Sequence, residues 1–228
     1  MTIRPGLSRR AALVGLSTTP ALVFATAQAA SPEPGTCRLT PKSIEGPFYL
    51  DPRLVRSELG EGRPGMPLRL NLRIVEAGAC TPIRGARVDV WHADAQGLYS
   101  GYEGQGDRRR ISTAGQAFLR GTQVSDGAGA VAFETIYPGW YPGRATHVHF
   151  KVFMDSRTLV TGQMYFPDEV NEAVYREAAY GNRAFRRDTL NATDVFARSE
   201  DPQRLGFCTM MREGGRHLAS LTIAVQGR

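Results

Sequence analysis

The sequence predicts an all-β fold: a β-sandwich of the Greek-key, immunoglobulin or transthyretin type, with one short helix and long loops. Three observations support this prediction. Short segments that alternate apolar and polar residues recur along the chain, and only one segment has a helical pattern. The 228 residues include 25 Gly and 14 Pro, many of them between the alternating segments. Closely spaced strands with such turns are typical of two packed sheets.

The clearest expected strand covers residues 68–74, where leucine or isoleucine stands at every second position. Ser125-Asp126-Gly127 predicts a hairpin between two further strands, at 118–124 and 130–136. A helix is expected over 168–180, because Pro167 precedes this segment and Gly181 follows it. The remaining strands are expected at residues 86–91, 146–154 and 218–225.

Residues 1–30 are expected to be an export signal peptide, and residues 31–228 the folded domain. The segment has paired basic residues at Arg9-Arg10, then a soft apolar stretch, and ends on Ala27-Gln28-Ala29, a pattern that signal peptidases accept. The paired arginines resemble a twin-arginine leader. We therefore expect an exported protein, either periplasmic or secreted.

Composition and charge narrow the range of partners. The net charge is +6, but residues 1–30 contribute three arginines and no acid, and the other charges are scattered, so we expect no nucleic-acid partner. No apolar run reaches the roughly 18 residues of a membrane span. Cys37, Cys80 and Cys208 predict one disulfide and one spare thiol in an exported protein, without indicating the pair.

The pair His147-Val148-His149 indicates a metal site. On a strand, residues two positions apart point to the same side, so both imidazoles would face away from the side of Val148. The alternative is a solvated polar face. Two histidines need further ligands, and neither a Cys nor a carboxylate residue lies close to them in the sequence.

Tyr99 and Tyr141 are candidates for these ligands, and Tyr141 lies six residues before His147. A phenol ordinarily loses its proton only near pH 10. Tyrosine ligands therefore require a strongly charged, hard cation, and Fe(III) is the biological candidate. The spacing alone does not establish that the tyrosines reach the histidines.

Four segments together resemble the intradiol ring-cleavage dioxygenases, a family that includes catechol 1,2-dioxygenases and protocatechuate 3,4-dioxygenases. They occur in the family's order and lie at residues 44–49, 88–99, 141–150 and 163–166. The resemblance implies a β-sandwich with one non-haem Fe(III) per chain. It also implies the four iron ligands, which are Tyr99, Tyr141, His147 and His149.

The resemblance further implies that Tyr141 leaves the iron when substrate binds. It identifies Arg144 as the active-site arginine, with Gln163 beside it, and it places Ile44 and Pro47 in the wall of the catechol pocket. A catechol-type substrate would be cleaved with O₂ to a cis,cis-muconate-type diacid.

The identity of the catechol stays open, although the few cations near the expected pocket favour a neutral one. The run Arg108-Arg109-Arg110 could bind an anionic substrate, but adjacent charges in a loop are usually only solvated. The family is usually dimeric or larger, so a homodimer is possible. However, the helical dimerisation element of catechol 1,2-dioxygenases is not recognisable before the first strand.

Two other functions are alternatives to the dioxygenase. A cupin-like enzyme would use the His147/His149 pair for Fe(II) or Mn(II), but cupins add a Glu shortly afterwards, and here His217 is the only later histidine. A non-catalytic β-sandwich module could instead present Tyr137, Trp140 and Tyr141 to sugar or aromatic ligands. Metal analysis would separate this module from the enzymes.

Overall fold

The computed structural model describes residues 1, 36–51, 53–181 and 183–227. The chain divides into two units, Met1–Pro32 and Glu33–Arg228. The predicted signal peptide, residues 1–30, lies outside the described residues apart from Met1, and it stays a prediction. The second unit carries all the strands and helices given below.

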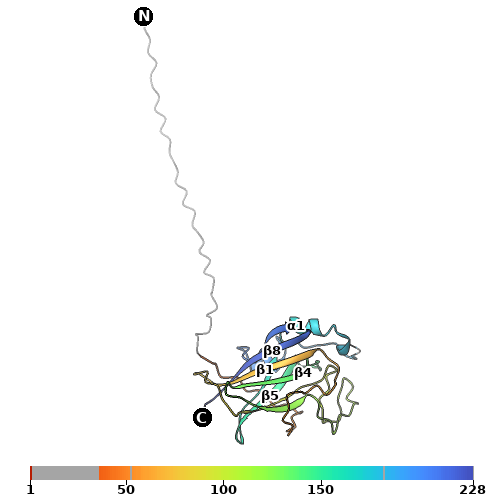
Figure 1. The fold of residues 1–228 in the computed structure, drawn as a ribbon. Coiled ribbons are helices and arrows are strands. Elements are labelled where there is room, and N and C mark those ends of the chain that lie inside the picture. Colours follow the sequence, from red (N-terminus) through yellow and green to blue (C-terminus); the bar gives the residue numbers. More distant parts are fainter. Residues whose placement is uncertain (2–35, 52, 182, 228) are drawn as a thin grey trace. The chain divides into compact units, whose positions relative to one another are not determined.

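This unit contains two four-stranded sheets (Figure 1). The first has the order β4-β1-β8-β7, in which β1 and β8 are parallel. It comprises β1 (Pro67–Glu76), β4 (Ala130–Ile136), β7 (Thr209–Glu213) and β8 (Arg216–Val225). The second has the order β3-β2-β5-β6 and comprises β2 (Arg87–Trp91), β3 (Arg120–Val124), β5 (His147–Met154) and β6 (Arg157–Tyr165).

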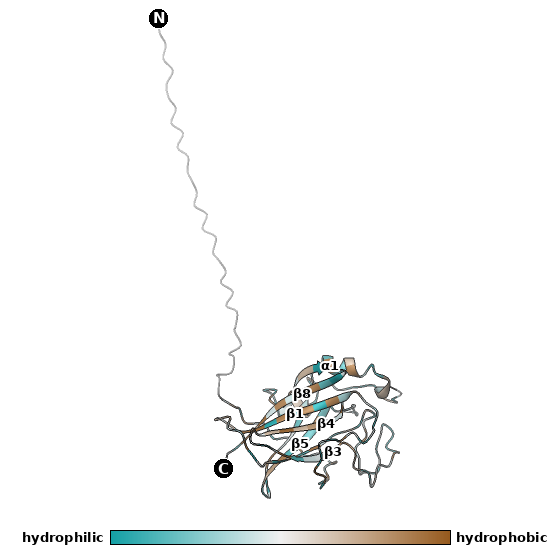
Figure 2. Cartoon of the chain, in the orientation of Figure 1, coloured by the Kyte–Doolittle hydropathy of each residue, from teal (hydrophilic) through white to brown (hydrophobic). Residues whose placement is uncertain are grey.

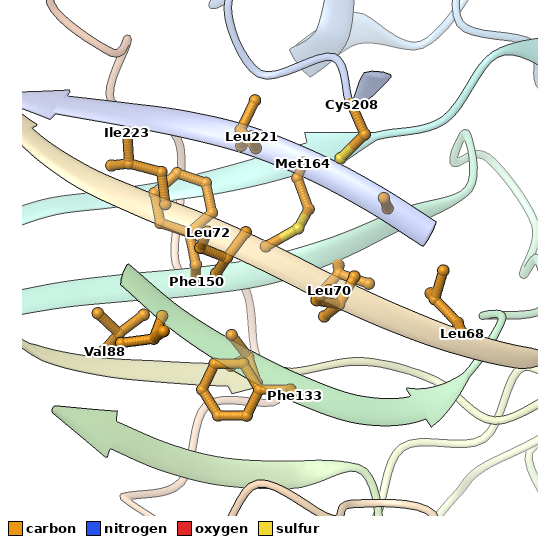
Figure 3. Close-up of a cluster of buried hydrophobic side chains, with 14 of the residues drawn as sticks. Leu68, Leu70, Leu72, Val88, Phe133, Phe150, Met164, Cys208, Leu221 and Ile223 are labelled. Carbon is orange, nitrogen blue, oxygen red and sulfur yellow. The ribbon is translucent and has the colours of Figure 1, made fainter. Parts of the chain in front are cut away.

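The core is built from the inward faces of both sheets. In β1, Leu68, Leu70 and Leu72 are at most 2% exposed, as their alternation with polar residues predicts. Figure 2 shows this alternation as hydrophilic and hydrophobic bands along β1 and β8. These leucines belong to one cluster with Val88 of β2 and Phe150 of β5, so the two sheets pack face to face (Figure 3). The predicted β-sandwich is therefore confirmed.

All six expected strands are present, with shifts of a few residues at their ends, but the predicted hairpin is wrong. Strand β3 pairs with β2 and β4 pairs with β1, so the turn between them connects the two sheets. Ser125 Oγ accepts from Ala86 N, and Asp126 Oδ1 accepts from the N–H groups of Ala128 and Ala130. These local bonds satisfy the turn without any pairing between β3 and β4.

The predicted helix over 168–180 is divided into α1 (Asp168–Val174) and a 3₁₀ turn, η1 (Ala178–Tyr180). Tyr180 is buried, and its hydroxyl donates to Tyr137 O and accepts from Met66 N, which fixes the end of the segment on the sandwich. The sequence did not predict β6, β7 or a second short helix, α2 (Val195–Ser199).

Cys37 and Cys80 form a disulfide, and Cys208 is a buried free cysteine, so the expected arrangement of one bridge and one thiol is confirmed. The described part of the chain contains no helix that is both long and apolar enough to cross a membrane.

Candidate metal centre

Strand β5 positions the two histidines on the sheet face opposite the core. Val148 and Phe150 of this strand are fully buried between the sheets, so the alternation turns His147 and His149 to the other side. The His149 ring stacks on Trp91, its cross-strand neighbour in β2, with ring centroids 4.9 Å apart and planes 7° apart. This stacking fixes the orientation of the His149 ring.

Both tyrosines reach these histidines from loops. Tyr141 Oη lies 2.9 Å from His147 Nε2, and Tyr99 Oη lies 3.4 Å from the same nitrogen. The two phenol oxygens are 3.5 Å apart, and His149 Nε2 is 3.1 Å from His147 Nε2. The fold thus brings together four donor atoms from residues up to 50 positions apart, a juxtaposition that spacing alone could not establish.

The protonation states follow from burial. His147 Nδ1 donates to Ala145 O at 2.7 Å, so Nε2 turns its lone pair towards the other donors. Burial lowers the pKa of His147 and His149 well below the usual range, so both rings are neutral at pH 7. Burial raises the pKa of Tyr99 and Tyr141 above the ordinary value, so both phenols keep their protons unless a cation stabilises the phenolates.

This donor set fits Fe(III). The described residues contain no group of three or more His, Cys, Asp or Glu side chains that could hold a metal, so a metal here has to use the tyrosine oxygens. Two phenolates supply the negative charge that a hard trivalent cation requires, and two neutral imidazoles complete the set. Zinc and copper would give no comparable reason for tyrosine.

Arg144 lies beside the donors and is held on three sides. Its Nη1 is 3.4 Å from His147 Nε2, its Nη2 donates to Gln163 Oε1, and its Nε donates to Asp194 Oδ2 at 2.8 Å. Gln163 is the β6 residue that pairs with His149. The structure therefore places Gln163 beside Arg144, next to strand β5.

Asp194 is a residue that the sequence analysis missed. It is fully buried, and besides Arg144 it accepts from Ala145 N at 2.7 Å. Its other oxygen accepts from Phe196 N and Ala197 N and so caps α2. An aspartate before a short helix is a recognisable cap signal, but its contact with Arg144 depends on the folding of a distant loop.

A pocket of about 350 Å³ borders the two tyrosines. Pro47 lines it, as expected, whereas Ile44 is not among the lining residues and its side chain is 45% exposed. The carbonyl of Ile44 instead accepts from Gln163 Nε2 at 3.3 Å. The lining residues are Pro47, Phe48, Gly97, Tyr99, Gly104, Gln105, Gly106, Asp107, Arg109, Tyr141 and Pro142.

The remaining candidates have structural positions. His217 belongs to the other sheet and packs on Tyr137, with ring centroids 5.8 Å apart, so it cannot complete a cupin-like site. Tyr137 is 0% and Trp140 is 7% exposed, so these rings are not presented to a ligand. His92, the one other histidine of the sequence, is buried and hydrogen-bonds Ala93 O and Thr135 Oγ1, and Thr135 belongs to β4 of the first sheet.

Comparisons with known proteins agree with this geometry. The protocatechuate 3,4-dioxygenase beta chain of Burkholderia cepacia is 32% identical over 169 residues, which are 69% of this chain and 69% of that protein. A catechol 1,2-dioxygenase of Acinetobacter baylyi is 28% identical over 63% of this chain, and the match spans only 51% of that longer relative.

Among solved structures, an intradiol ring-cleavage dioxygenase from Tetranychus urticae is similar with a TM-score of 0.76 and 30% identity. The similarity covers 83% of this chain and 95% of that one. The dioxygenase domain of a carbohydrate-binding fusion protein from Streptomyces sp. SirexAA-E has a TM-score of 0.62 and 25% identity, over 83% and 99% of the two chains.

The sequence profile of a family described as Dioxygenase matches residues 41–200, which is most of the chain and includes all four donors and Arg144. Together with the two-sheet fold and the named relatives, this match leads to one conclusion. The chain belongs to the intradiol ring-cleavage dioxygenase family of oxidoreductases.

Proposed function

We propose that this protein is a non-haem Fe(III)-dependent intradiol dioxygenase that cleaves the ring of a catechol-type substrate with O₂ to give a cis,cis-muconate-type diacid. The observation that carries the proposal is the convergence of two phenol oxygens and two imidazole nitrogens, with donor separations of 2.9 to 3.5 Å. The family membership gives independent support.

Tyr99, Tyr141, His147 and His149 would hold the metal. A ferric ion held there would supply Lewis-acid chemistry that makes the bound catechol ring reactive towards O₂. Tyr141 is half-buried and borders the pocket, whereas Tyr99 is only 1% exposed. Tyr141 is therefore the ligand that can yield its place to substrate, and its Oη would accept a proton from one catechol hydroxyl.

Arg144 would stabilise the negative charge that develops on the ring and on the attacking oxygen. Its guanidinium keeps its charge at any working pH and is fixed by Gln163 and Asp194 before substrate arrives. A charge that is already in position costs no reorganisation during the reaction.

A visible absorption spectrum tests the proposal. Purified protein loaded with iron should show a red-brown tyrosinate-to-iron band that moves to longer wavelength on anaerobic addition of catechol. Tyr141→Phe should keep part of the iron but change this band and slow turnover. Tyr102→Phe is the matched control, because the Tyr102 hydroxyl donates to Tyr49 O and lies outside the donor set. A colourless protein after iron loading would overturn the proposal.

We also propose that the protein is exported, to the periplasm or the medium. The leader-like pattern of residues 1–30 supports this, and so does the Cys37–Cys80 disulfide, because such bonds persist in oxidising compartments. Fractionation of the producing cell tests the proposed export, and retention in the cytoplasm would contradict it.

A homodimer stays a prediction, which light scattering of the purified protein would check.

A further inference from the structure

Tyr141 and Arg144 are the first and last residues of one tight turn. Arg144 N donates to Tyr141 O at 3.3 Å, and Pro142 and Gly143 occupy the two central positions. The φ of Gly143 is 79°, the value that the third residue of a type II turn requires and that favours glycine. A displacement of this turn would therefore move the Tyr141 phenol and the Arg144 guanidinium together.

A later part of the chain, residues 183–194, holds both ends of this turn, and we call it the clamp segment. Before the turn, Arg183 Nη1 donates to Trp140 O at 2.9 Å. After the turn, Asp194 Oδ2 accepts from Ala145 N at 2.7 Å. The backbone is thus bonded to the clamp segment on either side of the two site residues.

Asp188 of the clamp segment holds the centre of the turn. Its carboxylate accepts from Gly143 N, which lies 3.0 Å from one oxygen and 3.3 Å from the other. Thr189 is buried, and its Oγ1 donates to Asp188 Oδ1 at 2.8 Å, which restricts the orientation of the carboxylate. An ionised acceptor binds a backbone N–H more strongly than a neutral one does.

The clamp segment is itself anchored on both sides of Asp188. The side chain of Arg187 is only 7% exposed, and its guanidinium pairs with Asp168 of α1. Asn191 Nδ2 donates to Phe166 O, just after the end of β6, at 2.7 Å. An exposed aspartate on an unanchored loop would fix little, whereas here the bonds on either side keep its carboxylate in a defined position.

Resting on the proposed function, we propose that Asp188 is a positioning residue for the reaction. By holding Gly143 N, it keeps the turn in one place while the Tyr141 phenol moves away from the metal site. Tyr141 and Pro142 both line the pocket, so a turn that shifted would also change the pocket wall. With the turn held, the phenol moves by rotation of its own side chain, and Arg144 keeps its alignment.

Amide hydrogen exchange of the metal-free protein tests whether Asp188 holds the turn. Asp188→Ala removes the acceptor and should raise the exchange rate of the Gly143 amide by about fivefold. Asp188→Asn keeps an acceptor oxygen and should restore most of the protection. Asp126→Ala is the matched control, because Asp126 is another exposed aspartate that accepts from backbone N–H groups, in the turn between β3 and β4. An unchanged Gly143 rate in Asp188→Ala would overturn the proposal.

Kinetics and spectra of the iron-loaded protein test whether this hold matters for the reaction. For catechol, Asp188→Ala should lower kcat by about fivefold, change KM by less than about twofold and shift the visible band to which Tyr141 contributes. Iron content should stay unchanged, because the other three donors keep their positions. Asp188→Asn and Asp126→Ala should stay within about twofold of the wild type in both kinetic constants.

Two results would overturn the role of Asp188 in the reaction. One is faster exchange of Gly143 in Asp188→Ala with an unchanged kcat and an unchanged visible band. The other is an equal loss of kcat in Asp188→Ala and Asp126→Ala. A wild-type protein that binds iron but cleaves no catechol would instead count against the proposed function, because the exchange measurement needs neither iron nor turnover. The two failures are therefore distinguishable.

Discussion

The four donor residues differ in how firmly the fold holds them. Tyr99 is buried, its backbone is bonded to Gln105, and its ring stacks on Phe48 with centroids 4.6 Å apart. His147 and His149 are fixed by the Ala145 carbonyl and by Trp91. Tyr141 alone is half-buried and belongs to a loop, so it is the least constrained of the set.

Replacing His147 tests the donor set at this scale. His147 Nε2 lies within 3.5 Å of the three other donor atoms, so His147→Ala should lower the affinity for iron by at least about tenfold. Iron per chain, measured by elemental analysis after purification, checks this. His217→Ala removes a histidine of the other sheet and should retain iron, whereas full iron content in His147→Ala would contradict the assignment.

Removing the charge of Asp194 tests how Arg144 is held. Asp194→Asn leaves a largely buried guanidinium without its counterion, so we expect the free energy of unfolding to fall by about 3 kcal/mol. Denaturant unfolding measures this change. Glu61→Gln breaks the more exposed Arg56–Glu61 pair and should cost less than about 1 kcal/mol. Equal effects in the two variants would mean that Asp194 contributes no more than a surface charge.

The sequence could indicate which residues lie close together where a short pattern carried that information, but not where it depended on long-range folding. The resemblance named the four donors, Arg144 and Gln163, and the structure brings all of them together. It could not name Asp194 or Gln105, because their contacts join segments whose positions only the tertiary fold determines. No local sequence pattern distinguishes a polar loop residue that contacts the site from one that is only solvated.

Among the elements, strand β5 has two roles, because its side chains point alternately to the core and to the candidate metal site. One face of the strand contributes Val148 and Phe150 to the core, and the other presents the two histidines. The sequence predicted this strand well because its period is strong. It mispaired β3 and β4, because a local turn signal contains no information about which sheet each strand joins.

Close packing behind β5 gives a prediction for the element. A Cβ at Gly162 would lie 2.3 Å from Phe150 Cζ, and Phe150 is fully buried, so Gly162→Ala should destabilise the protein by about 1 to 3 kcal/mol. The melting temperature reports this. Gly127→Ala, where a Cβ would meet nothing within 4 Å, is the control and should leave the melting temperature almost unchanged. An unaffected Gly162→Ala would mean that the ring moves aside at little cost.

For the whole molecule, the disulfide cross-links residues 43 positions apart and restricts the unfolded chain. Reduction should therefore lower the free energy of unfolding by about 3 kcal/mol and leave iron binding unchanged. Thermal unfolding with and without reductant measures this. The double variant Cys37→Ser/Cys80→Ser is the control, since reductant should not shift its melting temperature. An equal shift in the variant would assign the effect to another cause.

The parallel pairing of β1 and β8 has a practical consequence for attaching the protein to a surface. The backbone of Cys37 is hydrogen-bonded to that of Gly78, just beyond the C-terminal end of β1. Next to it, Val225 O accepts from Ala77 N. The opposite end of this ten-residue strand, about 30 Å away, pairs with Ile136, five residues before Tyr141. A tag or support joined at either end of the sandwich chain would therefore attach at the same end of β1, and the strand that leads to Tyr141 would end at the opposite one.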